Sequence, residues 1–144
     1  MNKIIIPCLF FISLMPRNSH AVDRLLSVSK FYKILNLEKN VILIDIRTSE
    51  EYQSGHIKNA VNIEWLNNFE DYIQELDTNK TILFYCKSGE LNTEALKLFI
   101  YKGFKNTYVL QAGLAAWKNT NHTIVSSKRP VNKGISIEIG RAHV

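Results

Sequence analysis

Residues 81–103, TILFYCKSGELNTEALKLFIYKG, decide the fold because they join a strand pattern to a helix pattern through a short loop. Thr81–Tyr85 is an apolar run with the length and composition of a strand that is buried on both faces. Thr93–Lys102 carries apolar residues at helical spacing, and Gly103 follows at the position where a glycine ends a helix. The segment therefore predicts a strand–loop–helix unit in which Cys86 comes directly after the strand.

Strand and helix patterns alternate on both sides of this unit. Further strands are predicted at Val41–Ile46, Ala60–Ile63 and Thr107–Leu110, and helices at Ser27–Asn36, Trp65–Leu76 and Gly113–Lys118. A short helix is also predicted from Thr48, because Thr48 and Glu51 have the spacing of a capping box. Repeated alternation of strands and helices predicts an α/β fold with a parallel sheet and helices on both of its faces.

Length and composition are those of one domain with an ordinary core. The chain has 144 residues, of which 46% are hydrophobic and 22% are charged. The net charge is +5, and the basic residues are scattered rather than gathered in a stripe, so no nucleic-acid partner is predicted. Histidines and cysteines are scattered too, and no phosphate-loop or dinucleotide motif occurs, so the sequence predicts neither a metal nor a cofactor.

The first 21 residues have the pattern of a secretory signal peptide. Lys3 precedes an apolar run, Ile4–Met15, that is too short to cross a bilayer comfortably. Ser19 and Ala21 are the small residues expected before a cut that follows Ala21. We expect residues 1–21 to be removed, which leaves no stable membrane anchor on a periplasmic or otherwise exported protein. The alternatives are a buried N-terminal strand or an uncleaved anchor.

The remaining chain is expected to form one domain over residues 22–137. The last seven residues, 138–144 (EIGRAHV), are similar to a reading-frame translation of a sequencing-library adapter, so this tail is interpreted as a sequencing artefact. The alternative is a natural polar tail, because chain ends are often frayed. No function is assigned to this segment under either interpretation.

Cys86 would be the only cysteine left after removal of the signal peptide, because Cys8 is removed with it. Exported proteins usually use cysteines in pairs, so an unpaired cysteine is either an inert buried residue or is kept for chemistry. Cys86 follows a strand end, where sites of α/β sheets form, and a helix N-terminus and Lys87 lie nearby. This environment favours a thiolate, and Gly89 lets the backbone turn tightly. The pattern therefore favours a nucleophilic cysteine that carries a negatively charged adduct.

Two stretches carry motifs in a characteristic order. Residues 43–63, LIDIRTSEEYQSGHIKNAVNI, contain Asp-x-Arg at a predicted strand and then Gly-His-Ile. Residues 84–117, FYCKSGELNTEALKLFIYKGFKNTYVLQAGLAAW, contain the cysteine loop, the following helix and a closing Gly-Leu-x-x-Trp segment. Both stretches resemble the single-domain rhodaneses, a family of sulfurtransferases. The resemblance covers most of the mature chain and implies a rhodanese-like domain, of which small exported forms are a known type.

The resemblance also implies a mechanism in which Cys86 attacks the outer sulfur of thiosulfate or a related donor, releases sulfite and holds a persulfide. A thiol or cyanide would then remove the sulfur, so the partners are small sulfur-containing anions and thiol acceptors. The adduct would be held, mostly by backbone N–H groups, in a cradle of Lys87, Ser88, Gly89, Glu90 and Leu91. Asp45 and Arg47 match the family's strand-end pair, which is chiefly structural, and His56 matches a turn residue.

Three residues depart from the family's pattern. Leu91 stands where the family often has an arginine that could hold an anionic donor. Glu90 adds a negative charge to the cradle, which should repel thiosulfate. Ala112 stands where a first glycine is common before Gly113. The first two departures predict slow use of thiosulfate and leave the persulfide chemistry intact.

Two other functions stay open at this point. Dual-specificity phosphatases also use a rhodanese-like fold, but their longer loop ends in an arginine six residues after the cysteine, where this chain has Asn92. A phosphatase is therefore not favoured. The second alternative is a catalytically weak rhodanese-like module that carries sulfur or binds a protein, which Leu91 favours and the retained Cys86 argues against.

Overall fold

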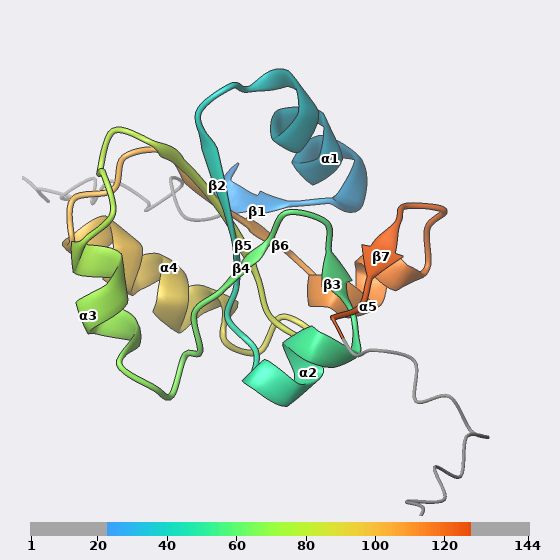
Figure 1. Ribbon diagram of the computed structural model, residues 1–144. Helices are drawn as coiled ribbons and strands as arrows, with labels where there is room; N and C mark the ends of the chain where they lie inside the picture. Colours follow the sequence, from blue (N-terminus) through green and yellow to red (C-terminus); the bar gives the residue numbers. More distant parts are fainter. Residues whose placement is uncertain (1–22, 128–144) are drawn as a thin grey trace, which may run out of the picture.

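The computed structural model describes residues 23–127, so the predicted signal peptide and the tail at 138–144 lie outside the described residues. Its centre is a five-stranded sheet in the order β1-β6-β5-β2-β4, in which all neighbouring strands are parallel (Figure 1). The strands are β1 (Leu25–Leu26), β2 (Val41–Asp45), β4 (Val61–Asn62), β5 (Thr81–Tyr85) and β6 (Thr107–Leu110). The predicted parallel sheet is confirmed.

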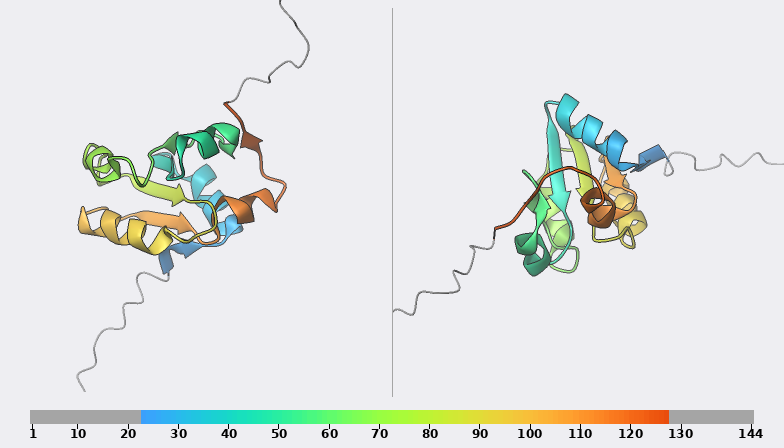
Figure 2. Two further views of the ribbon diagram at one scale, coloured as in Figure 1. Left: turned by 90° about the horizontal axis from the view of Figure 1, so that it is seen from below. Right: turned by 90° about the vertical axis from the view of Figure 1, so that its right-hand side faces the viewer.

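Helices cover both faces of this sheet, as predicted (Figures 1 and 2). They are α1 (Val28–Leu37), α2 (Ser49–Ser54), α3 (Phe69–Gln74), α4 (Asn92–Tyr101) and α5 (Gly113–Lys118). Residues of α3 and α4 belong to one buried cluster, and residues of α1 and α5 belong to a second cluster across the sheet. No helix within residues 23–127 is both long enough and apolar enough to cross a membrane.

The central strand β5 explains why the sheet is buried on both sides. Ile82 and Phe84 pack in the cluster with α3 and α4, whereas Leu83 and Tyr85 pack in the cluster with α1 and α5. Successive residues of a strand point to opposite faces of the sheet. Helices cover both faces, so all four side chains are fully buried. An uninterrupted apolar run is therefore required at β5, and its carboxyl end presents the next residue, Cys86, at the edge of the sheet.

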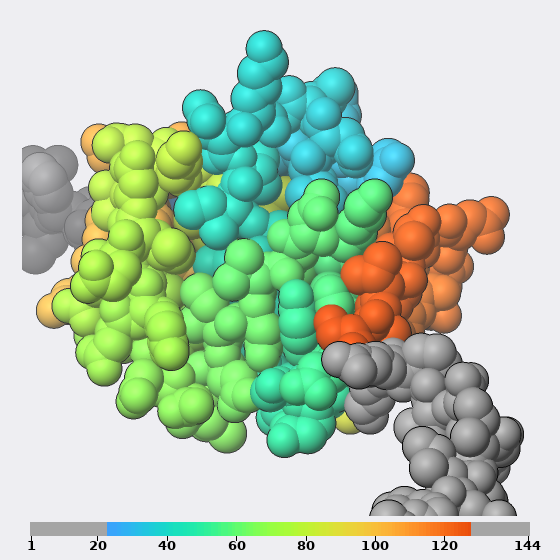
Figure 3. Space-filling model, in the orientation of Figure 1, coloured from blue at the N-terminus to red at the C-terminus, as the bar shows by residue number. Residues whose placement is uncertain are grey.

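A second, two-stranded sheet closes the side of the domain near α2. Strand β3 (His56–Ile57) pairs antiparallel with β7 (Ile124–Val125), which brings the last described residues against the middle of the chain. Figure 3 shows this red segment packed beside the green one on the surface. The backbone N–H of Ser127 also donates to the carbonyl of Gln53 at 3.1 Å. This contact ties the last described residues to α2.

The predicted helix at Trp65–Leu76 was wrong over its first turn, because α3 begins only at Phe69. The N–H of Trp65 donates to the carbonyl of Ile46 at 3.1 Å, so this residue follows the edge of β2. Asn68 then adopts a left-handed conformation with φ of 54°, which a continuous helix does not allow. The strands β1, β3 and β7 were not predicted, since two residues carry no periodic pattern.

Candidate active site

The loop between β5 and α4 places Cys86 at the carboxyl end of the central strand. Its side chain is 1% exposed and forms part of the floor of a pocket of about 290 Å³. The backbone N–H of Gly89 donates to the Cys86 sulfur at 3.0 Å. Helix α4 begins at Asn92, so the predicted strand–loop–helix unit is present with the predicted spacing. Cys86 is a free cysteine, with no disulfide partner within residues 23–127.

Two glycines let this loop lie directly against the corner between β6 and α5. Gly89 has φ of +106°, and a Cβ atom there would collide with the carbonyl oxygen of Gln111. Gly113 has φ of +60°, and a Cβ atom there would lie 2.6 Å from the carbonyl oxygen of Cys86. Ala112 has φ of −107°, an ordinary conformation for alanine, so this departure from the family's pattern has no backbone cost.

The first turn of α5 holds the other side of the loop. The backbone N–H groups of Leu114 and Ala115 donate to the carbonyl oxygens of Cys86 and Lys87 at 2.9 and 3.0 Å. These donors have no partner inside their own helix, because the first N–H groups of any helix are left unpaired. The loop carbonyls therefore point toward α5, and the backbone of the loop is fixed from both ends.

Asn92 is the site residue that sequence reasoning missed. Its side chain is buried, and its Oδ1 accepts a hydrogen bond from the Cys86 sulfur at 3.4 Å. Its Nδ2 donates to the carbonyls of Leu110 and Gln111 at 3.1 and 2.9 Å. The amide cannot be reversed, because its oxygen would then face two carbonyl oxygens. Sequence analysis used this position only to argue against a phosphatase, although it opens the helix next to the cysteine.

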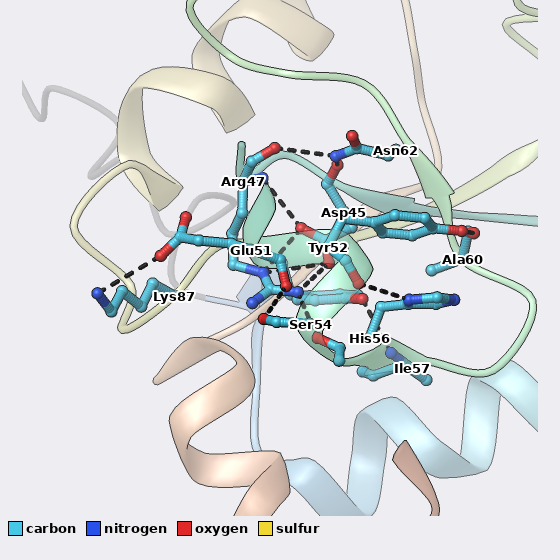
Figure 4. Close-up of polar contacts among 12 residues, drawn as sticks. Asp45, Arg47, Glu51, Tyr52, Ser54, His56, Ile57, Ala60, Asn62 and Lys87 are labelled. Atoms are coloured by element: carbon cyan, nitrogen blue, oxygen red, sulfur yellow. Dashed lines mark hydrogen bonds and ion pairs between the residues drawn. The ribbon is translucent and has the colours of Figure 1, made fainter. Parts of the chain in front are cut away.

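Asp45 and Arg47 form a buried ion pair at the end of β2 (Figure 4). The Arg47 Nη2 lies 2.6 Å from Asp45 Oδ2 and also donates to the carbonyl of Gly55 at 2.7 Å. Burial alone would lower the pKa of the Arg47 guanidinium, but the hydrogen bonds and charge of Asp45 outweigh it and raise that pKa. Arg47 borders the Cys86 pocket, yet its charge is already committed to Asp45.

The Gly-His-Ile turn lies beside this pair and away from the sulfur. The Nδ1 of His56 donates to the carbonyl of Tyr52 at 2.7 Å, and the two rings stack with centroids 3.7 Å apart (Figure 4). The hydroxyl of Tyr85 accepts from the N–H of Ile57 at 3.0 Å. Burial, with a contribution from the charge of Asp45, raises the pKa of this hydroxyl. His56 is thus paired within the turn and does not line the pocket over Cys86.

Comparison with known proteins shows the family. The family model described as "Rhodanese-like domain" matches residues 27–120. The chain belongs to the rhodanese-like domain family. Thiosulfate sulfurtransferase GlpE of Coxiella burnetii is 26% identical to this rhodanese-like chain over 91 residues, which are 63% of the chain and 84% of the relative. Protein BU052 of Buchnera aphidicola is 30% identical over 123 residues, which are 83% and 82% of the two chains.

A solved structure shows the same fold. The rhodanese-like domain of a protein from Anabaena sp. superposes with a TM-score of 0.64 at 22% identity and covers 84% of this chain and 95% of its own. The alignment confirms the α/β architecture. The relatives show that the chain is a rhodanese-like domain. Its activity depends on the residues around Cys86.

The predicted cradle of this rhodanese-like domain has backbone donors without acceptors. Within residues 23–127, no hydrogen bond occupies the backbone N–H groups of Lys87, Ser88 and Leu91. The N–H of Gly89 already points at the sulfur. Successive unpaired N–H groups around one atom form a site where negative charge is stabilised. The loop can therefore receive an anionic group attached to Cys86.

Both charged side chains of the cradle have polar partners. Lys87 Nζ lies 3.4 Å from Glu51 Oε1 on α2 (Figure 4). Within residues 23–127, no hydrogen bond joins the Glu51 carboxylate to the N–H of Thr48, as the predicted capping box would require. The other half of that box is present, since Thr48 Oγ1 accepts from the N–H of Glu51 at 3.3 Å. The hydroxyl of Ser88 donates to the carboxylate of Glu90, and this hydrogen bond lowers the pKa of Glu90. Glu90 is exposed and ionised at neutral pH.

The pocket over Cys86 has a mixed lining in the rhodanese-like domain. Cys86 is the only cysteine among its lining residues, which also include apolar side chains, the hydroxyl of Thr48, three carboxylates and the cations Arg47 and Lys87. No cluster of three or more His, Cys, Asp or Glu residues within residues 23–127 is arranged to hold a metal ion.

Proposed function

We propose that the protein is a sulfurtransferase that moves one sulfane sulfur from a small donor to a thiol acceptor through a persulfide on Cys86. The observation that carries this proposal is the surroundings of the sulfur. A free thiol lies at the floor of a pocket, with one N–H on its sulfur and further unpaired N–H groups in the same loop. Such a site stabilises a nucleophilic sulfur and a terminal persulfide anion.

The reaction has two displacement steps at sulfur. In the first, the Cys86 thiolate attacks the outer sulfur of the donor, and the donor's own bond to that sulfur breaks. The leaving group departs with the bonding electron pair, as sulfite where the donor is thiosulfate. In the second step, an acceptor thiolate attacks the outer sulfur of the persulfide, and Cys86 leaves as a thiolate. No external oxidant or reductant is needed, and ping-pong kinetics follow.

The surrounding residues supply position and charge stabilisation rather than proton transfer. The N–H groups of Gly89, Lys87 and Ser88 would hold the negative persulfide, in the manner of an oxyanion hole. The Asp45–Arg47 pair keeps the end of β2 and the turn after α2 in place beside the loop. In this mechanism, Cys86 is the only residue that forms a covalent bond with the transferred sulfur.

A sulfur carrier or protein-binding module that does not turn over by itself is the second candidate. The observation that favours it is the 1% exposure of Cys86, since a buried sulfur is poorly reached by a free donor. The presence of Leu91 instead of an arginine also favours this second candidate. The two candidates differ in whether a loaded persulfide passes its sulfur to a small thiol.

Mass spectrometry of the purified protein after incubation with thiosulfate tests the proposal. We expect one added sulfur atom, located on Cys86, and its loss when a small thiol is added. The Cys86→Ser variant should stay unmodified under the same conditions. Loading without release to a small thiol would indicate the carrier. Absence of added sulfur with thiosulfate and with an organic persulfide donor would overturn the sulfurtransferase and the sulfur carrier and would favour the protein-binding module.

A further inference from the structure

The pocket over Cys86 has an apolar wall that the proposed chemistry of thiosulfate does not use. The wall consists of Ile46, Trp65, Leu66 and Leu91. Leu66 is 90% exposed, and Trp65 and Leu91 are partly exposed. A single exposed leucine is ordinary on a protein surface, but this one borders the same pocket as the reactive sulfur and a tryptophan. A donor that covered these side chains would gain the free energy of burying apolar surface.

Both cations of the same pocket already have a carboxylate partner. Arg47 is paired with buried Asp45 at 2.6 Å, and Lys87 lies 3.4 Å from Glu51. A doubly charged donor would have to compete with these carboxylates for both partners. Leu91 occupies the position where an arginine would have supplied an unpaired positive charge. The pocket therefore offers an anionic donor backbone N–H groups but no unpaired cationic side chain among its lining residues.

Further carboxylates face the same space. Glu64 borders the pocket, and its Oε1 is fixed by the N–H of Ser49 at 2.6 Å. Glu90 also borders the pocket, and the hydrogen bond from Ser88 keeps its pKa low. With Glu51, the pocket is lined by three carboxylates and by only two cations, both of which are paired. Like charges repel, so each negative charge that a donor carries beyond its reacting sulfur raises the cost of binding.

We infer that the sulfur donor of this site is a small organic molecule with an apolar body and a single negative charge on its outer sulfur. This inference rests on the proposed function. The donor is an organic persulfide, R–S–S⁻, or its thiosulfonate analogue, R–SO₂–S⁻. Cys86 attacks the outer sulfur, the bond between that sulfur and the rest of the donor breaks, and R–S⁻ or R–SO₂⁻ leaves with the electron pair. The R group lies on the wall of Trp65, Leu66 and Leu91.

A series of alkanethiosulfonates with chains from methyl to pentyl separates the apolar contribution from the charge. The reacting group and its single charge stay constant along the series, so only the apolar area changes. We expect kcat/KM to rise about two- to fourfold for each added methylene. Thiosulfate carries the same type of sulfur–sulfur bond with one more negative charge, and its kcat/KM should be below that of the methyl compound.

The wall itself is tested by a pair of leucine variants. Leu66→Ser should reduce the dependence of kcat/KM on chain length. Leu37→Ser is the matched control, because Leu37 is 69% exposed at the end of α1 and does not line the Cys86 pocket. The control should keep the slope of the unchanged protein. Both substitutions replace exposed side chains, and circular dichroism with thermal unfolding verifies that the variants fold.

The outcomes distinguish this inference from the proposed function. A flat series together with measurable thiosulfate turnover would overturn the apolar donor and leave the sulfurtransferase standing. An unchanged slope in Leu66→Ser would overturn the assignment of the wall. Absence of sulfur on Cys86 with every donor, at concentrations that load a known rhodanese, would instead overturn the proposed function.

Discussion

Asn92 presents its side-chain carbonyl, and not its amide nitrogen, to the sulfur of Cys86. The sulfur–oxygen distance is 3.4 Å, and the nitrogen is held on the opposite side by the carbonyls of Leu110 and Gln111. The sulfur therefore has an acceptor on one side and the N–H of Gly89 on the other. The thiol donates to Asn92 and accepts from Gly89, so both partners fix the position of the sulfur.

Replacing Asn92 should have two separable effects. Asn92→Ala leaves two carbonyls without their donor, and we expect the free energy of unfolding to fall by about 1–3 kcal/mol. The same variant should also raise the rate of Cys86 alkylation by iodoacetamide at one fixed pH, because the sulfur loses the hydrogen bond that holds it. Urea unfolding and the alkylation rate measure the two effects.

Asn36→Ala is the control for the stability effect. Asn36 also donates its side-chain Nδ2 to a backbone carbonyl, that of Tyr32 at 2.7 Å, but this contact is exposed to solvent. Surface substitutions of this kind change stability by about 0.5 kcal/mol or less. Equal losses of stability in the two variants, or an unchanged alkylation rate in Asn92→Ala, would contradict the role given to Asn92.

Leu91→Arg should increase the use of thiosulfate. A guanidinium at this rim adds a charge-assisted hydrogen bond to a dianion, worth about 1.5–3 kcal/mol, which corresponds to about one to two orders of magnitude in kcat/KM. The gain should shrink at high salt, because exposed charges are screened. Glu90→Gln should help by less. Steady-state assays with thiosulfate at two ionic strengths measure this, and an unchanged or lower kcat/KM in a folded Leu91→Arg protein would show that the rim does not bind the donor.

Gly113→Ala should disrupt the loop far more than the matched change at Gly103. Gly103 has φ of +90° with no atom near its missing Cβ, so alanine there costs only backbone strain, about 1–2 kcal/mol. At Gly113 the same strain is joined by a collision with the carbonyls of Cys86 and Lys87. Thermal unfolding and sulfur loading of Cys86 compare the two variants. Similar losses in both would mean that the close approach to Cys86 is not needed.

Tyr85 should make the domain lose stability in alkaline solution. Burial raises the pKa of its hydroxyl in the folded state, so the folded protein keeps the proton that an unfolded chain loses near pH 10. Stability from this group is complete below that pH and falls as the pH rises above it, by about 1.4 kcal/mol per pH unit. Urea unfolding from pH 8 to pH 11 should therefore show a shallower decline in Tyr85→Phe. Tyr101→Phe, which changes a ring that is 82% exposed, should keep the original slope.

The sequence predicts most reliably those elements that contribute side chains to the two buried clusters. Thr81–Tyr85, Thr107–Leu110 and Gly113–Lys118 were predicted with the bounds that the structure shows, because each has a strong apolar pattern between clear end signals. The segment from Trp65 to Asn68 was wrongly predicted to be helical, since Trp65 and Leu66 line the pocket and Trp65 lies beside the end of β2. Apolar spacing alone does not tell which neighbour a side chain meets.

In the candidate site, too, local patterns predict some features and miss others. The place of Cys86 at a strand end follows from local patterns, and so does the helix that begins six residues later. The tether from Asn92 to Leu110 and the pairing of Lys87 with Glu51 depend on which strands and helices become neighbours. Contacts between segments far apart in the chain leave no signal in the residues of either segment. Such contacts are visible only in the folded structure.

The contacts that hold the 86–92 loop also fix the number of residues it contains. The carbonyl of Cys86 is held by α5, Gly89 lies against Gln111, and Asn92 is tied to the same corner of the chain. An inserted residue would have to bulge outward between two of these attachments or break one of them. Lengthening the loop toward phosphate chemistry therefore places the added residue on the pocket side or demands a matching change in the β6–α5 corner. An engineer would have to design the corner and the loop together.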